Sequence, residues 1–232
     1  MLETAGREAE KLLGRDRSGH GMDHTLRVRD LAVRIAREEG ADPDTVALAA
    51  LLHDADDYKL FGMENAETLS NAKAIMDAAG TESAMREAVL GIISTMGYGN
   101  SLAGIRPESI EGKCVSDADM IDGMGATGII RMIEFNATRR GGHYFDRNIF
   151  PKLDKTKDEY RQLDAPDSNF VNHFFEKALR IKNILMTRSG RLLAEGRHKI
   201  MADFLLQFFA EQDAPEWTAY LKDFLASDEN GS

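Results

Sequence analysis

Cysteine is nearly absent from this chain. A single thiol, Cys114, stands among 232 residues, which excludes an internal disulfide and a zinc site built from several thiolates. The sequence also lacks a run of eighteen apolar residues, so no segment is expected to span a membrane. The first residues include acids and no apolar stretch, which argues against a secretory signal. A reducing cytoplasm is the expected location.

Positive charge is also scarce. Lys and Arg number 29 against 39 Asp and Glu, which gives a net charge of −10. This balance argues against a broad nucleic-acid-binding face. A site for a phosphate substrate would therefore need local positive charge, supplied by a cation or by a few basic side chains.

Proline is rare, and its five occurrences fall where the apolar periodicity lapses. Between them apolar residues recur at threes and fours, and no strand-type alternation is sustained, which indicates helix. We expect one all-α domain, a helical bundle over 1–226, with a core at about 18–138, C-terminal helices at about 165–226 and a frayed tail at 227–232. The expected helices span residues 2–13, 22–39, 44–55, 66–79, 83–96, 108–121, 124–138, 169–187, 190–211 and 216–226.

Two polar stretches interrupt the helices. Residues 97–101 form a glycine-rich segment that predicts a turn. Residues 139–168 form a long polar insertion, with a short helix expected around 154–163. Connections of this length in compact domains are often functional, commonly as a lid.

The first candidate site residue is His24. Along residues 22–39 the apolar stripe through Val28, Ala32 and Ile35 places His24 at the N-terminal end of the core-facing side. A lone histidine in such a position more often bonds a backbone carbonyl than a ligand, so other polar groups must decide between these readings.

The second candidate is the doublet His53-Asp54. It follows Val46–Leu52, which is apolar all round and predicts a helix buried on most sides. A buried carboxylate without a partner costs several kcal/mol, so Asp54 would be paired or bound to a cation. The alternative is that this helix ends at solvent, with Asp54, Asp56 and Asp57 exposed.

The third candidate segment, 113–123, carries three acids among apolar residues. Helical periodicity alone does not decide which of Asp117, Asp119 and Asp122 faces inward. Two histidines and two or more carboxylates on three helices make a mixed nitrogen and oxygen ligand set. Such a set suits manganese, iron, nickel, cobalt or zinc, and suits magnesium less well.

Taken in order, these segments resemble the HD-domain metal-dependent phosphohydrolase superfamily, and more closely a bacterial subgroup related to nucleotide pyrophosphohydrolases. The resemblance covers roughly residues 18 to 211, whereas the stretch 141–164 matches no part of the subgroup and is a candidate contributor to the substrate pocket. The segments that carry it are His20-Gly21-Met22-Asp23-His24, Leu52-His53-Asp54, Asp117-Ala118-Asp119-Met120-Ile121-Asp122-Gly123, His173-Phe174-Phe175-Glu176-Lys177 and Ala194-Glu195-Gly196-Arg197-His198.

The resemblance implies four metal ligands. These are His24, His53, Asp54 and Asp119, with Asp117 as the reserve for the fourth position. His20, which precedes the matching helix, and Asp122 are candidate substrate contacts. The remaining histidines are expected to be structural or surface groups: His143, His173 and His198.

The implied activity is hydrolysis of a phosphate ester or phosphoanhydride in a small molecule, most plausibly a nucleotide, by water that a divalent metal ion activates. The ion would also supply the local positive charge. Asp56 and Asp57 follow the doublet closely enough to orient water or move a proton, and Asp57 has the spacing from His53 used in the superfamily. The nearest bases, Lys59 and Arg27, are candidate substrate contacts, with Lys59 favoured; either could instead pair with these aspartates.

Alternative functions remain open at this point. Within the hydrolase hypothesis, release of pyrophosphate from a nucleoside triphosphate competes with removal of a single phosphate. A non-catalytic metal- or nucleotide-binding regulatory module is the alternative of a different class. A structural helical protein with a chance His-Asp doublet is the third. The expected partner is a small phosphorylated molecule, and a homodimer is left open by the extensive helical surface.

Overall fold

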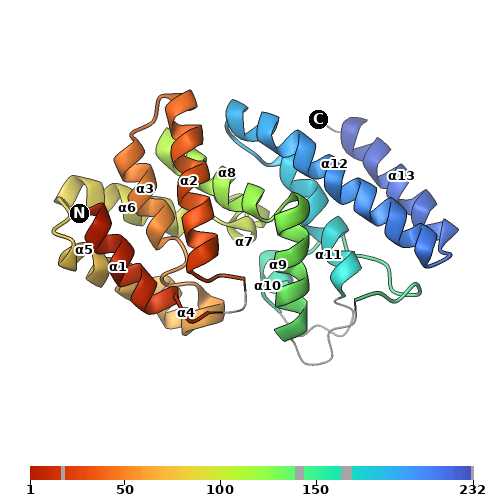
Figure 1. The fold of residues 1–232 in the computed structure, drawn as a ribbon, viewed down its shortest axis with the longest axis horizontal. Coiled ribbons are helices and arrows are strands. Elements are labelled where there is room, and N and C mark those ends of the chain that lie inside the picture. Colours follow the sequence, from red (N-terminus) through yellow and green to blue (C-terminus); the bar gives the residue numbers. More distant parts are fainter. Residues whose placement is uncertain (17–18, 139–143, 163–168, 231–232) are drawn as a thin grey trace.

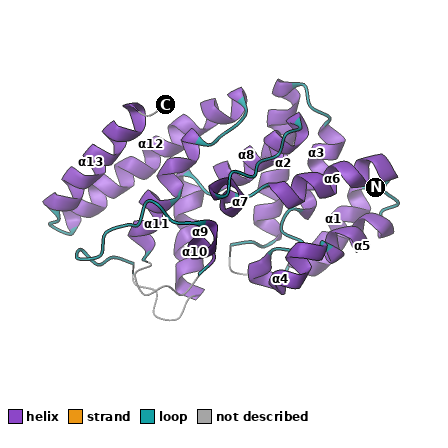
Figure 2. Cartoon of the chain, turned by 180° about the vertical axis from the view of Figure 1, so that it is seen from behind, coloured by secondary structure: helices purple, strands orange, loops and turns teal. Residues whose placement is uncertain are grey.

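The computed structural model of the chain describes residues 1–16, 19–138, 144–162 and 169–230. Within these ranges the chain forms helices and loops without a β-strand, which confirms the all-α prediction (Figure 2). No helix of the described chain is both long and apolar enough to cross a membrane.

The described residues form thirteen α-helices and one 3₁₀ helix. In chain order they are α1 Leu2–Leu13, α2 Met22–Glu39, α3 Pro43–Leu52, α4 Tyr58–Thr68, α5 Ser70–Ala78, α6 Ser83–Thr95, α7 Tyr98–Leu102, α8 Ile110–Asp122, α9 Gly125–Thr138, α10 Lys157–Arg161, α11 Phe170–Glu176, the 3₁₀ helix η1 Ala178–Asn183, α12 Arg188–Glu211 and α13 Pro215–Asn230.

The N-terminal half is built around α3. Its start is fixed by Asp42, whose side chain accepts hydrogen bonds from the amides of Asp44 and Thr45, and by Pro43 in the first turn. All of Thr45–Leu52 is buried, as an apolar helix in the middle of a core should be. Helix α2 packs on both α3 and α8 (Figure 1), so the three segments that carry the candidate site lie together.

The C-terminal half has an aromatic core. Trp217 of α13 is fully buried and its ring stacks on that of Phe150, with centroids 4.6 Å apart. Phe175 and Phe209 pack against the same indole. Helix α9 lies between the two halves in Figure 1 and packs on α8, α11 and α12.

Most expected helices are present within a few residues of their predicted bounds, but two segments were predicted wrongly as non-helical. Residues 58–65 belong to α4, a helix that sequence reasoning placed only from 66 because none of its residues is buried and Gly62 kinks it with φ 84°. The helix expected over 66–79 is divided at Leu69, between α4 and α5. Residues 98–102 form the short helix α7 instead of a turn; it is anchored by the buried Tyr98, whose hydroxyl donates to the Glu176 carbonyl at 2.7 Å.

Two other bounds differ from expectation. The helix expected over 169–187 breaks at Lys177, whose φ of −139° and ψ of −65° separate α11 from η1. The expected frayed tail is helical as far as Asn230 in α13. The short helix expected around 154–163 is confirmed as α10, which begins with a capping box between Thr156 and Glu159. The division into core and C-terminal extension stays a prediction.

Candidate metal centre

Two histidines from different helices face each other at the end of the N-terminal core. His24 comes from the first turn of α2 and His53 from the residue that ends α3, and their Nε2 atoms lie 3.2 Å apart. Nδ1 of His24 lies 2.7 Å from Asp122 Oδ2, and Nδ1 of His53 lies 2.8 Å from the Ala50 carbonyl. Because a carboxylate and a carbonyl only accept, each Nδ1 carries a proton and donates it. A neutral ring then presents its lone pair at Nε2, toward the other ring.

Two carboxylates converge on the same point. Asp54 Oδ2 lies 3.4 Å from Nε2 of His24 and 3.3 Å from Nε2 of His53, and Asp119 Oδ1 lies 3.5 and 3.8 Å from the same atoms. Asp54 Oδ2 is buried and accepts no hydrogen bond. Ligand atoms of His24, His53 and Asp119 lie within 4.8 Å of one another, as a metal ion requires. Four acceptors around one point are stable only with a proton or a cation among them, so these residues fit a divalent ion.

The pKa values in this cluster also indicate a site that favours a cation. Burial alone would lower the pKa of His24, but the neighbouring carboxylates of Asp119, Asp122 and Asp54 outweigh burial and raise the pKa to about 10. Burial would raise the pKa of Asp54, yet the two histidines hold it well below its usual range. The cluster therefore attracts positive charge strongly.

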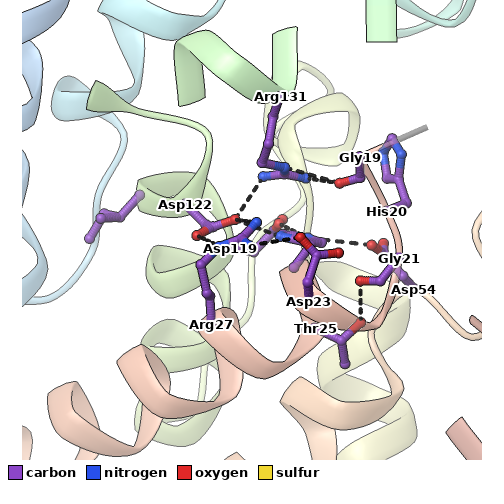
Figure 3. Close-up of polar contacts among 12 residues, drawn as sticks. Gly19, His20, Gly21, Asp23, Thr25, Arg27, Asp54, Asp119, Asp122 and Arg131 are labelled. Carbon is purple, nitrogen blue, oxygen red and sulfur yellow. Dashed lines mark hydrogen bonds and ion pairs between the residues drawn. The ribbon is translucent and has the colours of Figure 1, made fainter. Parts of the chain in front are cut away.

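Asp122 lies behind His24 and is held from two sides, by Arg27 and Arg131 (Figure 3). Its Oδ1 accepts from Arg27 Nε at 3.0 Å and its Oδ2 from Arg131 Nη1 at 3.2 Å. Burial opposes ionisation, but the bonds from His24 and Arg27 lower the pKa of Asp122 to about 2. Asp122 and Arg27, both predicted to contact the substrate, thus form an ion pair with each other. Arg27 also pairs with Asp23, at 2.9 Å. Sequence reasoning missed Arg131, although a lone base inside an apolar helix face was a usable signal.

The structure separates the three acids of α8. Asp119 points into the cluster, and Asp122 bonds the back of His24. Asp117 is buried elsewhere: it accepts from the amides of Met186 and Thr187 and from the Thr187 hydroxyl at 2.6 Å, which fixes the start of α12. Asp119 is therefore the α8 acid that joins the cluster, as the resemblance implied.

Asp56 and Asp57 behave differently from each other. The Asp56 carboxylate accepts from the amides of Asn71 at 2.9 Å and Ala72 at 2.8 Å, so it is committed to the start of α5. This geometry does not favour the catalytic role predicted for Asp56. Asp57 caps α4 by accepting from the Lys59 amide at 2.8 Å, and burial together with the nearby Asp54 raises its pKa.

A cavity of about 130 Å³ opens beside the cluster. None of the four cluster residues lines it, but His20 does, and the His20 ring centre is 6.4 Å from that of His24. Lys59 Nζ lies 3.2 Å from His20 Nε2 and donates to it. Burial and Lys59 lower the pKa of His20 to about 4, despite Asp54, so the imidazole is a neutral acceptor at pH 7.

The remaining histidines have different surroundings. His173 lines the cavity, and the Nε2 atom of His198 in α12 is buried; the structural or surface role expected for both stays a prediction. His143 lies outside the described residues, as do 139–142 and 163–168 of the predicted lid.

The helical bundle and its cluster of two histidines and two aspartates define a class of protein. A family model of the HD domain matches residues 21–124, and the chain belongs to the HD-domain family, which includes metal-dependent hydrolases. It is 35% identical to YpgQ of Bacillus subtilis over 211 residues, which are 89% of this chain and 90% of that protein.

Solved structures agree with this assignment. A Lactobacillus plantarum protein matches with a TM-score of 0.81 and 31% identity, covering 92% of this chain and 97% of that one. YpgQ in complex with ADP matches with a TM-score of 0.70 and 29% identity over 91% and 97%. An HD-superfamily hydrolase from Bacillus thuringiensis matches with a TM-score of 0.68 and 29% identity over 92% and 97%.

Proposed function

We propose that this protein is a metal-dependent phosphohydrolase that acts on a small phosphorylated molecule, most plausibly a nucleotide. The observation that carries the proposal is the convergence of the Nε2 atoms of His24 and His53, 3.2 Å apart, with a buried Asp54 oxygen that accepts no hydrogen bond. The ADP bound to the relative YpgQ supports a nucleotide as substrate.

The metal ligands in this proposal are His24, His53, Asp54 and Asp119. A bound divalent ion would supply Lewis acidity toward a phosphoryl oxygen and would lower the pKa of water. The mixed nitrogen and oxygen donors suit manganese, iron, cobalt, nickel or zinc better than magnesium.

In this proposal, Lys59 binds the substrate and Asp57 accepts the proton of the attacking water. Lys59 is the cation beside the cluster and binds a phosphoryl oxygen, with neutral His20 accepting from its ammonium group and so fixing its position. Asp57, whose pKa is raised, accepts a proton from the attacking water more readily than an ordinary aspartate. Both residues lie within a few positions of the His53-Asp54 doublet.

Two variants test this assignment against the wild type, with bound metal and turnover measured separately. The wild type is expected to bind a divalent ion and to hydrolyse at least one nucleotide in a screen with manganese, cobalt, nickel and magnesium. Asp54→Ala is expected to lose both properties. Asp57→Asn is expected to keep the metal and lose turnover by about 100-fold or more, as for removal of a positioned acid or base.

Each contrary result has its own meaning. Wild-type protein that binds metal and nucleotide but hydrolyses no nucleotide or phosphate ester would favour the regulatory module. Wild-type protein that stays free of metal on titration would refute the site itself. Release of pyrophosphate or of a single phosphate in the same screen identifies the bond that is cleaved.

A further inference from the structure

The wall of the cavity opposite His20 and Lys59 comes from the C-terminal part of the chain. Tyr160 of α10 and Lys177, at the break after α11, both line it. Both residues lie outside the segment 21–124 that matches the HD-domain family model. The metal cluster and a large part of the cavity wall are therefore supplied by different parts of the sequence.

Lys177 is held over aromatic rings. The backbone break at Lys177 ends α11, and its Nζ lies 5.4 Å from the ring centre of Tyr98 and 5.7 Å from that of Tyr160. The two tyrosine rings lie with centroids 5.2 Å apart. A cation over two ring faces is attracted by their negative faces but is not neutralised by them.

Neighbouring lysines are paired, in contrast to Lys59 and Lys177. Lys152 pairs with Glu159 at 2.5 Å, and Lys155 pairs with Glu176 at 2.6 Å. Across the described ranges of the chain, no ion pair with a carboxylate joins Lys59 or Lys177. Two ammonium groups that form no direct ion pair within the described residues therefore line one cavity, in a protein whose net charge is −10.

Tyr160 lines the same cavity as these two cations. A phenol group can donate its proton, which an ammonium group cannot accept because it has no lone pair. The phenol proton is then free to be donated to another acceptor. Burial would raise the pKa of Tyr160, but Lys177 and Lys59 outweigh burial and lower it, which makes the hydroxyl a stronger donor.

We propose that Tyr160, Lys177 and Lys59 form an anion subsite that binds a phosphate-chain oxygen of the substrate other than the one at the metal. Tyr160 donates its hydroxyl proton to that oxygen, and the two lysines supply the positive charge. This inference rests on the proposed function and adds to it that the C-terminal segment, through α10 and the break at Lys177, contributes substrate affinity. The HD segment by itself holds the metal.

The test measures inorganic pyrophosphate binding to the metal-loaded protein by calorimetry, together with KM and kcat for the best substrate of the screen. Tyr160→Phe is expected to weaken pyrophosphate binding about tenfold and to raise KM with little change in kcat, because a hydrogen bond to a charged group is lost equally from ground and transition states. Lys177→Met is expected to weaken binding by about tenfold or more. Metal affinity and melting temperature should stay near wild type in both.

Lys152→Met is the matched control, since it removes a lysine of the same segment that is paired with Glu159 and does not line the cavity. Its pyrophosphate affinity is expected within about twofold of wild type. Folded Tyr160→Phe and Lys177→Met proteins that bind pyrophosphate as tightly as the wild type would overturn the subsite while leaving the proposed function intact. Failure of the wild type to bind pyrophosphate would also overturn the subsite, whereas failure of the wild type to turn over any phosphate compound would overturn the proposed function.

Discussion

At the scale of single residues, His24 shows that a metal site also depends on the residues that hydrogen-bond to its ligands. Its Nδ1 is bonded to Asp122, which is itself held by Arg27 and Arg131. A histidine ligand oriented by a carboxylate in this way binds metal more tightly, because the ring is fixed and its free nitrogen is more basic. We therefore propose that Asp122 is a positioning residue; the substrate contact predicted for it stays a prediction.

Replacing Asp122 tests this role. Asp122→Ala is expected to lower the affinity for divalent metal by about 10- to 100-fold, the usual effect of removing such a partner. Metal titration followed by calorimetry measures it. Asp23→Asn is the control, because Asp23 is exposed and pairs with Arg27, whereas the partner of the His24 ring is Asp122. Wild-type metal affinity in Asp122→Ala would contradict the role.

At the scale of helices, Asp56 illustrates how a residue beside a site can belong to another element. It stands two residues after Asp54, yet its carboxylate accepts amides at the start of α5 and an amide proton of Asn65 on α4. It therefore joins α4 and α5 to the end of α3. The sequence showed the proximity but not the direction of the side chain.

Asp56→Ala is expected to lower the free energy of unfolding by about 1–3 kcal/mol, because buried amides lose a charged acceptor. Metal affinity should stay near wild type. Urea denaturation and metal titration check the two properties. Asp44→Ala, at an exposed position of α3, should change the free energy of unfolding by no more than about 0.5 kcal/mol. Loss of metal binding with unchanged stability in Asp56→Ala would instead place Asp56 in the site.

At the scale of the whole molecule, the cluster links metal binding, folding and pH. Without metal, the raised pKa of His24 means that the folded protein holds a proton there at pH 7. This contributes stability to the metal-free protein that is fully present below pH 6.5 and is lost as the pH rises through about 10. A metal ion must displace that proton, so metal affinity rises with pH over the same range.

The increase in melting temperature on adding manganese is therefore expected to grow between pH 6.5 and 8.5. At 100 times the dissociation constant, bound metal adds about 2.7 kcal/mol to the free energy of unfolding. Thermal denaturation with and without the ion, at fixed ionic strength, measures the shift. His53→Ala, which should bind no metal, provides the control with no shift at any pH. A shift in the wild type that shrinks as the pH rises would contradict the linkage.

The fold was largely predictable because its helices bury continuous apolar faces. Val28, Ala32 and Ile35 repeat at helical spacing, and Val46–Leu52 is apolar all round, so α2 and α3 were expected within a few residues. Helix α4 buries no residue, and therefore left no periodic signal. The break at Lys177 also gave no signal in the sequence, because the chain is apolar and buried on both sides of it, at Phe174, Phe175, Ala178 and Leu179.

The sequence by itself determined which residue types were available for a metal site and on which helices they stand. Order and periodicity are enough to identify His24, the His53-Asp54 doublet and the acids of α8. Only the tertiary structure decided their directions: Asp119 toward the histidines, Asp122 behind His24, Asp117 toward α12 and Asp56 toward α5. The physical reason is that one helical turn presents neighbouring acids to different elements, and packing selects which element each one meets. The same holds for Tyr160 and Lys177, which reach the cavity only because α10 and the end of α11 pack beside it.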